Sequence, residues 1–220
     1  MTIKHLPSIP IEGHKASGAG APDHPMRIAT HRAAGLEPGG WTDELREDVT
    51  KYFDDLAAEW HSHITPERIA IVVDAITRGF RELGVSAHGP AIELGSGTGG
   101  YSAMLARYFG TVVAIDLSME MLRLAPPEPA HRVQADGARL PLRDSSAGAI
   151  VLINAFLFPD EVARVLDPGG VVVWVNSSAE QTPIYLSSEE LIARMPGAWD
   201  GVASRAGEGH WCVLRRAAAI

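Results

Sequence analysis

Apolar residues recur at helical spacing in the first third of the chain. From Asp43 onward, positions three and four residues apart predict one amphipathic helix, whose apolar side is formed by Leu45, Val49, Tyr52, Phe53, Leu56 and Trp60. A second helix is predicted after Thr65, an N-cap residue that precedes Pro66, and Gly84 is placed to end it. The pattern therefore predicts two helices ahead of the first strand.

The middle of the chain consists of short apolar runs that alternate with helical stretches. Five runs predict strands, at residues 91–94, 111–115, 131–135, 148–153 and 170–175. Continuous apolar character is typical of parallel strands that helices cover on both faces. After these runs, Ser187 and Glu190 have the spacing of a capping box, and the segments "GVASRAG" and "HWCVLRR", joined by "GEGH", predict a hairpin.

These elements predict an α/β fold of Rossmann-like type. We expect an open sheet, mostly parallel with a C-terminal antiparallel hairpin, with helices on both faces and an N-terminal helical lid. Residues 1–42 are rich in Gly, Pro, Ala and His, a composition that forms no compact core alone. We therefore predict an arm or lid over 1–42 and one domain over 43–220, with no second catalytic domain in 220 residues.

The charge balance narrows the classes of partner. The chain has 19 basic and 27 acidic residues, a net charge of −8, so it lacks the cationic character of nucleic-acid-binding proteins. Its single cysteine, Cys212, excludes an internal disulfide, and no apolar run approaches the length of about 20 residues that crosses a bilayer. The first residues lack the apolar centre of a signal peptide. We expect a cytoplasmic protein that binds neither nucleic acid nor membrane; a homodimer stays open.

Candidate chemistry begins at residues 91–105, "AIELGSGTGGYSAML". Four glycines within six residues, between a strand and a helix, allow the backbone to approach a ligand closely, and the helix start attracts negative charge. This pattern predicts a nucleotide-like ligand. Asp116 ends the next strand, where a carboxylate accepts hydrogen bonds from both hydroxyls of a ribose. Both NAD and adenosyl ligands carry that ribose, so the glycines and Asp116 leave the two open.

Five segments in order resemble the class I S-adenosylmethionine-dependent methyltransferases. They are "ELGSGTGG", "AIDLSMEML", "ADGARLPL", "DEVARVLDPGGVVVWV" and the closing hairpin, and the resemblance runs from about Tyr52 to the C-terminus. It implies that S-adenosyl-L-methionine is the cofactor, S-adenosyl-L-homocysteine the product and a small molecule the methyl acceptor. Two alternatives stay open: an NAD-linked oxidoreductase, and a non-catalytic partner protein that binds S-adenosylmethionine.

The resemblance also assigns cofactor-binding residues. The loop beneath the methionine part of the cofactor comprises Glu93, Gly95, Ser96, Gly97, Thr98 and Gly99. Asp116 is assigned to the ribose, and Asp136 with Gly137 to the adenine, against which Met119 and Leu140 would pack; Leu117 is a further cofactor-binding residue. Ligands of open α/β sheets lie beyond the carboxyl ends of the strands, which places Asn154 beside the transferable methyl group.

The acceptor is less well defined. Asn154 is followed by Ala-Phe-Leu and not by the Pro-Pro-aromatic sequence of DNA amino-methyltransferases, which favours a small-molecule acceptor. We predict that aromatic side chains wall an apolar pocket for it, with ordinary core positions as the alternative: Trp60, Phe156, Phe158 and Trp211. As catalytic residues we predict Asn154 and a histidine base, His210 before His61, although either histidine could be a solvated surface residue. No metal site is predicted, because no histidines have a metal-binding spacing.

Overall fold

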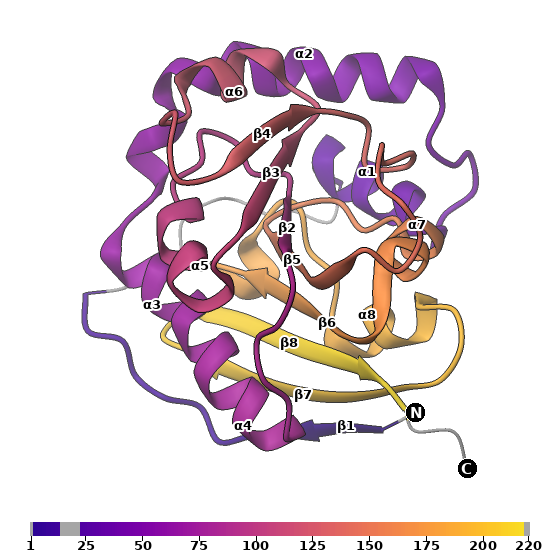
Figure 1. Cartoon of the computed structure of the whole chain (residues 1–220). Coiled ribbons are helices and arrows are strands. Elements are labelled where there is room, and N and C mark those ends of the chain that lie inside the picture. The colour runs from indigo at the N-terminus through magenta and orange to yellow at the C-terminus, as the bar shows by residue number, and fades with distance from the viewer. Residues whose placement is uncertain (1, 14–22, 218–220) are drawn as a thin grey trace.

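Within the described residues, 2–13 and 23–217 of a computed structural model, eight strands form one sheet (Figure 1). The strands are β1 Thr2–His5, β2 Ala91–Leu94, β3 Val112–Asp116, β4 His131–Gln134, β5 Ala147–Ile153, β6 Leu166–Asn176, β7 Trp199–Ala206 and β8 Gly209–Arg216. Their order is β1-β7-β8-β6-β5-β2-β3-β4. Neighbours are parallel except where β8 pairs with β6 and β7. The predicted Rossmann-like sheet with an antiparallel C-terminal hairpin is confirmed.

Strand β1 is a correction to the sequence analysis. Thr2–His5 pairs in parallel with β7, with Thr2 opposite Asp200 and His5 opposite Ala203, so a strand and not a helix comes first. The segment is short and mostly exposed, and its strand conformation depends on a partner almost 200 positions away. A local pattern does not encode such a pairing. The other strands start and end close to the predicted runs, although β6 already begins at Leu166.

The helices are α1 Pro25–Ala33, α2 Asp43–Trp60, α3 Pro66–Asp74, α4 Phe80–Leu83, α5 Ser102–Phe109, α6 Met119–Leu124, α7 Pro159–Val165 and α8 Ser188–Arg194. The predicted caps are present: the Thr65 hydroxyl accepts a hydrogen bond from the Arg68 N–H, and the Ser187–Glu190 capping box is complete. The predicted second helix ends at Gly84, but a π-helical turn at Ala75–Gly79 divides it into α3 and α4.

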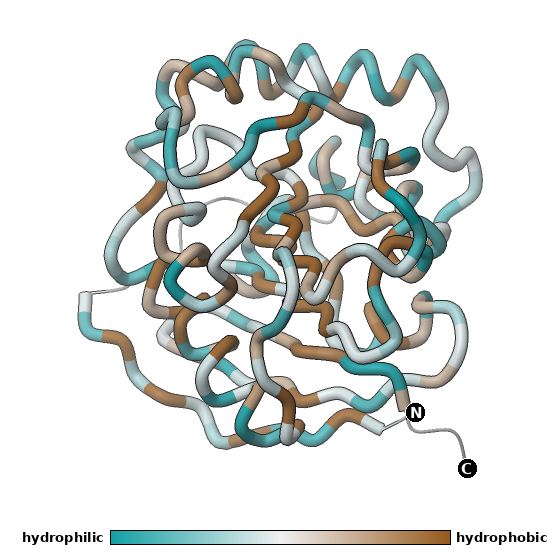
Figure 2. The backbone as a smooth tube through the Cα atoms, in the orientation of Figure 1, coloured by the Kyte–Doolittle hydropathy of each residue, from teal (hydrophilic) through white to brown (hydrophobic). Residues whose placement is uncertain are grey.

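Alternate strand residues pack on opposite faces of the sheet. Ile92, Leu152 and Trp174 pack with side chains of α7 and α8, whereas their neighbours Val151 and Val173 pack with α3, α4 and α5. Hydrophobic segments accordingly run through the central strands, and the outer helix α2 is mostly hydrophilic (Figure 2). Both faces are therefore covered, as the continuous apolar runs predicted.

A third apolar cluster lies where strands β3, β5 and β6 end. It joins Met26 and Ala29 of α1 and Val49 of α2 to Ile184, with Trp41, Leu45, Phe53, Leu117 and Phe156 packed against them. Leu117, Phe156 and Ile184 come from loops that follow these strands, so α1 and α2 cover the carboxyl ends of the sheet. Within the predicted arm, helix α1 thus covers the carboxyl ends of the strands, and Thr2–His5 forms strand β1. The Gly-rich stretch 14–22 lies outside the described residues. The division at residue 42 and the role as a lid stay predictions.

Candidate functional site

The glycine-rich loop after β2 forms the base of a cleft. The N–H groups of Gly95 and Ser96 both donate to the Ile115 carbonyl, at 2.8 and 3.0 Å, which attaches the loop to β3. Gly97 has φ +53°, and a Cβ there would lie 2.7 Å from Nε1 of Trp60. A side chain at this position would therefore strain the backbone and displace Trp60.

Two hydroxyl groups of this loop are buried without a partner. Ser96 is 5% exposed and Thr98 1% exposed, and neither Ser96 Oγ nor Thr98 Oγ1 has a hydrogen-bond partner among the described residues. Buried polar groups are nearly always satisfied, and leaving one unsatisfied costs free energy. The loop thus has the properties of a site completed by a polar ligand.

Asp116 connects the loop to the end of β3. One carboxylate oxygen accepts the Gly97 N–H at 2.7 Å, and the other accepts the Ser118 N–H at 2.8 Å. Burial raises the pKa of Asp116, and these N–H groups oppose the rise. The side chain lines the cleft beside Leu117, so each oxygen retains a lone pair for a ligand.

Asp136 lies at the opposite end, where Trp41 contacts it. The indole N–H donates to both carboxylate oxygens, each at 3.1 Å. The ring packs against Phe156 and Phe158, with centroids 5.5 and 5.1 Å apart. The carboxylate that the resemblance assigns to the adenine amino group therefore already accepts an aromatic N–H.

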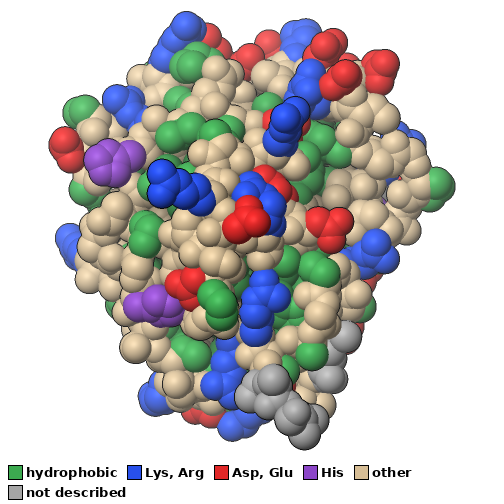
Figure 3. All heavy atoms as spheres, turned by 45° about the vertical axis from the view of Figure 1, so that its right-hand side comes forward, with side chains coloured by type: hydrophobic (Ala, Val, Ile, Leu, Met, Phe, Trp, Pro, Cys, Tyr) green, Lys and Arg blue, Asp and Glu red, His purple; other side chains and the backbone are tan. Residues whose placement is uncertain are grey.

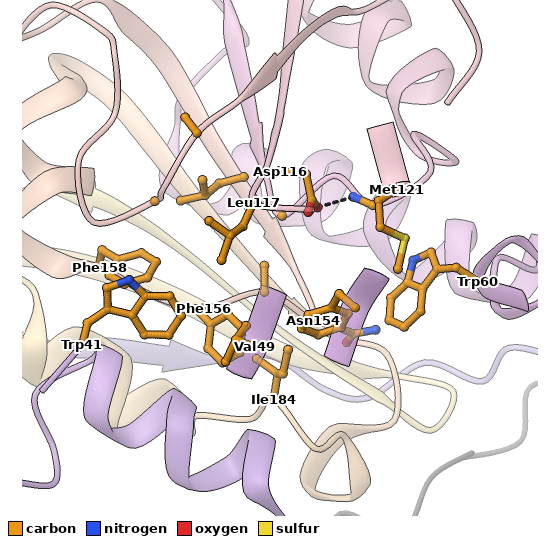
Figure 4. A pocket seen from close by; sticks show the side chains of 17 residues that line it. Trp41, Val49, Trp60, Asp116, Leu117, Met121, Asn154, Phe156, Phe158 and Ile184 are labelled. Carbon is orange, nitrogen blue, oxygen red and sulfur yellow. Dashed lines mark hydrogen bonds between the residues drawn. The ribbon is translucent and has the colours of Figure 1, made fainter. Parts of the chain in front are cut away.

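The cleft has two unlike sides, which we call the floor and the roof. The floor is formed by the segments 95–99, 116–117, 135–137 and 154, of which Gly95, Gly97, Asp116, Leu117, Ala135, Gly137 and Asn154 line the cleft, and the roof by Trp41, Val49, Phe53 and Trp60. Figure 4 shows Trp41 and Phe158 at one end, with Trp60 at the other. The enclosed volume is about 70 Å³, well below the roughly 300 to 1,000 Å³ typical of ligand pockets. A nucleotide-sized ligand therefore requires the roof to move outward.

A second cavity of about 300 Å³ adjoins the cleft and shares Phe53, Trp60, Asn154 and Ile184 with it. Asn154 directly follows β5 at φ +50°, a conformation that asparagine tolerates better than most residues. Its amide donates to Ser177 Oγ and accepts the Ser177 N–H, both at 2.9 Å. Asn154 is therefore held at the boundary between the two spaces.

Several predicted residues lie elsewhere. Met119 does not line the cleft, where Met121 takes its place, and Leu140 packs in the core. Glu93 points to the other face of the sheet, accepts a hydrogen bond from the Ser102 hydroxyl, and has its pKa raised to about 7 by burial. The prediction that Trp211 walls the pocket is wrong, because it is fully buried and donates to Asp74 at 2.7 Å.

The structure brings neither predicted histidine base to the cleft. His210 lies in a separate pocket, where Nε2 is 2.8 Å from Ser188 Oγ, and burial lowers the pKa of His210 to about 4. Such a histidine is a weak base at neutral pH. His61 is exposed in the 3₁₀ turn His61–His63 and lines neither space. Its neighbour His63 lines the second cavity, beside Trp60.

Sequence reasoning missed Trp41, His63, Arg68 and Ile184. The apolar pattern of residues 43–60 identified the side of α2 that carries Val49 and Phe53, but it does not show what that side covers. Trp41 follows the "EPGG" turn and bonds a residue 95 positions away. An isolated tryptophan after a Gly-Gly turn is the signal available for that contact.

The comparisons with known proteins agree with this geometry. Residues 92–174 match the family described as "Methyltransferase domain". Residues 92–174 thus form a methyltransferase domain. It is 36% identical to a demethylmenaquinone methyltransferase of Clavibacter sepedonicus, over 46% of each chain. It is 30% identical to the ubiquinone/menaquinone biosynthesis C-methyltransferase of Syntrophotalea carbinolica, over 57% of this chain and 62% of the relative. The chain thus spans about half or somewhat more of these relatives.

Among solved structures, the DhpI–SAH complex matches with a TM-score of 0.62 at 20% identity, over 81% of this chain and all of that one. This likeness supports the fold. The match of residues 92–174 to a methyltransferase domain supports S-adenosylmethionine as the cofactor and favours it over the NAD-linked alternative. Among the described helices none is long and apolar enough to cross a bilayer. No described group of three His, Cys, Asp or Glu side chains could hold a metal ion.

Proposed function

We propose that the protein transfers the methyl group of S-adenosylmethionine to a small molecule bound in the second cavity. The observation that carries this proposal is the junction at Asn154. The cleft with the assigned cofactor residues and the adjoining cavity share this side chain, so a methyl group at one end of the cleft faces the cavity. On the face drawn in Figure 3, positive and negative side chains are dispersed and form no continuous basic surface, in keeping with a small acceptor.

The floor has groups for each part of the cofactor. Asp116 accepts the ribose hydroxyls, Asp136 with Gly137 receives the adenine, and the buried hydroxyls of Ser96 and Thr98 gain partners at the methionine end. When bound, S-adenosylmethionine supplies a methyl group already activated on a positively charged sulfur.

Methyl transfer forms one bond between the acceptor atom and the methyl carbon and breaks the methyl–sulfur bond, whose electron pair stays on sulfur. The chain therefore contributes alignment and exclusion of water, which the roof supplies by closing over the floor. Asn154 fixes the boundary between the two spaces through its paired hydrogen bonds to Ser177.

A hydroxyl acceptor must also lose a proton. His63 is the histidine that lines the second cavity, so we assign the role of base to it in place of His210 and His61. A thiolate, a free amine or a carboxylate acceptor needs no such base. The effect of His63→Gln on turnover therefore reports the acceptor class, with His61→Gln as the matched control from the same turn.

The aromatic walls of the cavity, Tyr52, Phe53 and Trp60, favour an acceptor with an apolar ring. The curated relatives are named for demethylmenaquinone and for ubiquinone/menaquinone biosynthesis. Quinols are for this reason one class to be tried, beside phenols, amines, thiols and aromatic carboxylates.

Calorimetry followed by a methyl-release assay tests the proposal. The full chain is titrated with S-adenosylhomocysteine and then incubated with labelled S-adenosylmethionine and the acceptor panel. We expect binding and transfer to at least one acceptor class. Binding without transfer to any class would indicate the non-catalytic partner protein, and the absence of binding would contradict the proposal. Asp116→Asn, which keeps the shape of the side chain, is the control for cofactor dependence.

A further inference from the structure

The second cavity is lined by two kinds of side chain. Helices α1 and α2 supply mostly apolar groups: Met26, Tyr52, Phe53, Leu56 and Trp60. The segment that follows β6 supplies hydroxyl groups, among them those of Ser177 and Thr182. A ligand that fills this space therefore meets rings and aliphatic groups from the helices and hydroxyl groups from the segment after β6.

The hydroxyl hydrogen of Ser177 has no acceptor among the described residues. The Ser177 N–H donates to Asn154 Oδ1 at 2.9 Å, and this bond fixes which end of the Asn154 amide is the oxygen. The amide nitrogen at the other end then donates to Ser177 Oγ, also at 2.9 Å. The hydroxyl group is therefore an acceptor toward Asn154, and its own hydrogen is left for another group.

Thr182 repeats this arrangement five residues later. The Ser178 N–H donates to Thr182 Oγ1 at 3.1 Å, and because a backbone N–H can only donate, the hydroxyl group is the acceptor of this bond as well. Ser177 is 2% exposed and Thr182 is 4% exposed. Hydrogen-bonding groups that are buried to this degree are nearly always paired. Two hydroxyl hydrogens that line the second cavity thus lack an acceptor in the described part of the chain, and a ligand in that cavity is placed to supply it.

Both hydroxyl groups are held in place near the boundary with the cleft. Asn154, which bonds Ser177, lines the cleft as well as the second cavity, so an atom bound to the Ser177 hydroxyl lies close to that boundary. Arg27 of α1 donates to the Thr182 carbonyl at 2.8 Å and to the Pro183 carbonyl at 3.1 Å, which fixes this part of the segment. The two hydroxyl groups are therefore positioned before an acceptor binds.

We propose that Ser177 and Thr182 select the methyl acceptor by donating hydrogen bonds to oxygen attached to its apolar ring. A carbonyl or hydroxyl oxygen has lone pairs for these hydrogens, whereas an ammonium group has none and a ring without oxygen leaves both hydrogens unpaired. The inference rests on the proposed function and adds to it the class of acceptor, a ring compound that carries a carbonyl or hydroxyl oxygen. Ser177 and Thr182 are thus assigned as specificity-determining residues.

The test compares two ring compounds of the same shape. Acetophenone carries a carbonyl oxygen, and isopropenylbenzene has a CH₂ group in place of that oxygen. Both are titrated into the full chain saturated with S-adenosylhomocysteine, and binding is measured by ligand-observed NMR. Ser177→Ala and Thr182→Val each remove one hydroxyl group with little change in shape, and Thr182→Ser retains it. Ser188→Ala is the matched control, because it removes the hydroxyl group of a buried serine that lines the separate pocket of His210.

We expect Ser177→Ala and Thr182→Val each to weaken binding of acetophenone about threefold to tenfold, the effect of one neutral hydrogen bond, and to leave binding of isopropenylbenzene unchanged. A change in the shape of the cavity would affect both compounds alike, so the ratio of the two affinities reports the hydrogen bond. Thr182→Ser and Ser188→Ala should keep the wild-type ratio. A changed ratio in only one of the two hydroxyl-free variants assigns the oxygen to that residue alone.

The inference is overturned if folded Ser177→Ala and Thr182→Val both keep the wild-type ratio, or if the wild-type protein binds neither ring compound. The proposed function stands in either case as long as the wild-type protein binds S-adenosylhomocysteine and transfers a labelled methyl group to the acceptor panel. Wild-type protein that binds no S-adenosylhomocysteine contradicts the proposed function itself. Circular dichroism and thermal unfolding show that each variant is folded.

Discussion

The floor and the roof of the cleft are built by different means. Backbone hydrogen bonds fix the floor, as in the pairing of Gly95 and Ser96 with the Ile115 carbonyl and of Gly97 with Asp116. Ring packing holds the roof, with few polar attachments, such as the Trp41 indole N–H on Asp136. The floor is therefore organised before a ligand arrives, whereas the roof can separate from it at moderate cost.

Two further attachments show where the roof is anchored. Asp54 of α2 accepts a hydrogen bond from the Ser118 hydroxyl at 2.5 Å, close to Asp116, whose carboxylate accepts the Ser118 N–H. Arg27 of α1 donates to the carbonyls of Glu180, Thr182 and Pro183, at 2.7 to 3.1 Å, and so holds the loop that walls the second cavity. Opening is thus expected at the Trp41 end, away from these anchors.

The largest expected effect comes from Gly97→Val, which disturbs floor and roof together. A β-branched residue at φ +53° is strained by at least about 1 to 2 kcal/mol, and its side chain would meet Trp60. We expect affinity for S-adenosylhomocysteine to fall by roughly a hundredfold or more, or about 3 kcal/mol. The matched control is Gly110→Val, a left-handed glycine with open space around it. Equal affinities of the two variants would show that the floor does not carry the ligand.

Two buried titratable side chains, Glu93 next to the floor and His210 far from it, should change the stability of the protein with pH in opposite directions. Burial raises the pKa of Glu93 to about 7, so its contribution is complete below about pH 4.5 and is lost as the pH rises through 7. Burial lowers the pKa of His210 to about 4, so its contribution is complete above about pH 6.5 and is lost as the pH falls through 4.

Each pKa shift, from about 4.5 to 7 for Glu93 and from about 6.5 to 4 for His210, corresponds to at most roughly 3.5 kcal/mol. Thermal unfolding between pH 4 and 8 measures the contributions of Glu93 and His210 to stability. Because the two contributions oppose each other between about pH 4.5 and 6.5, the wild-type melting temperature should vary little there, and the variants should separate them: Glu93→Gln should gain stability as the pH rises, and His210→Asn should lose it. If the melting temperatures of both variants follow the wild-type curve, both assignments are contradicted.

Asp116→Ala tests the floor alone. The substitution removes the acceptor of the Gly97 and Ser118 N–H groups and the group assigned to the ribose hydroxyls. A charge-assisted hydrogen bond contributes about 1.5 to 3 kcal/mol, so affinity for S-adenosylmethionine should fall at least about tenfold. Calorimetry on the folded variant measures this, and an affinity equal to that of the wild type would refute the ribose assignment.

The smallest expected effect concerns the roof. Trp41→Phe keeps a ring beside Phe156 and Phe158 but removes the indole N–H from Asp136, which retains the Ala138 N–H, and this destabilises the ligand-free form by about 1 kcal/mol. S-adenosylhomocysteine, whose adenine supplies an N–H, should therefore bind about threefold to fivefold more tightly. Trp60→Phe is the control, because its indole lies over the Gly97 backbone and not over a carboxylate. Weaker binding by Trp41→Phe would show that the indole and the adenine do not share Asp136.

The same comparison explains what could be predicted from the sequence. The floor follows from local patterns. Gly95 comes directly after one strand and Asp116 ends the next, and the carboxyl ends of parallel strands meet at one edge of the sheet, so the residues there converge. The roof depends on contacts such as Trp41 with Asp136, which are far apart in the sequence and carry no periodic signal. The prediction for His210 failed for a similar reason: the hairpin was predicted, but His210 lies in β8 opposite Arg205 and not in the turn, and the face on which it packs could not be predicted.

The central claim is that an adenosyl cofactor binds between floor and roof. Calorimetric titration of the full chain with S-adenosylhomocysteine, repeated in the presence of excess NAD, tests it most directly. The account predicts one molecule bound per chain with an affinity that NAD does not change. A folded protein that binds NAD, or that binds neither ligand, would contradict it.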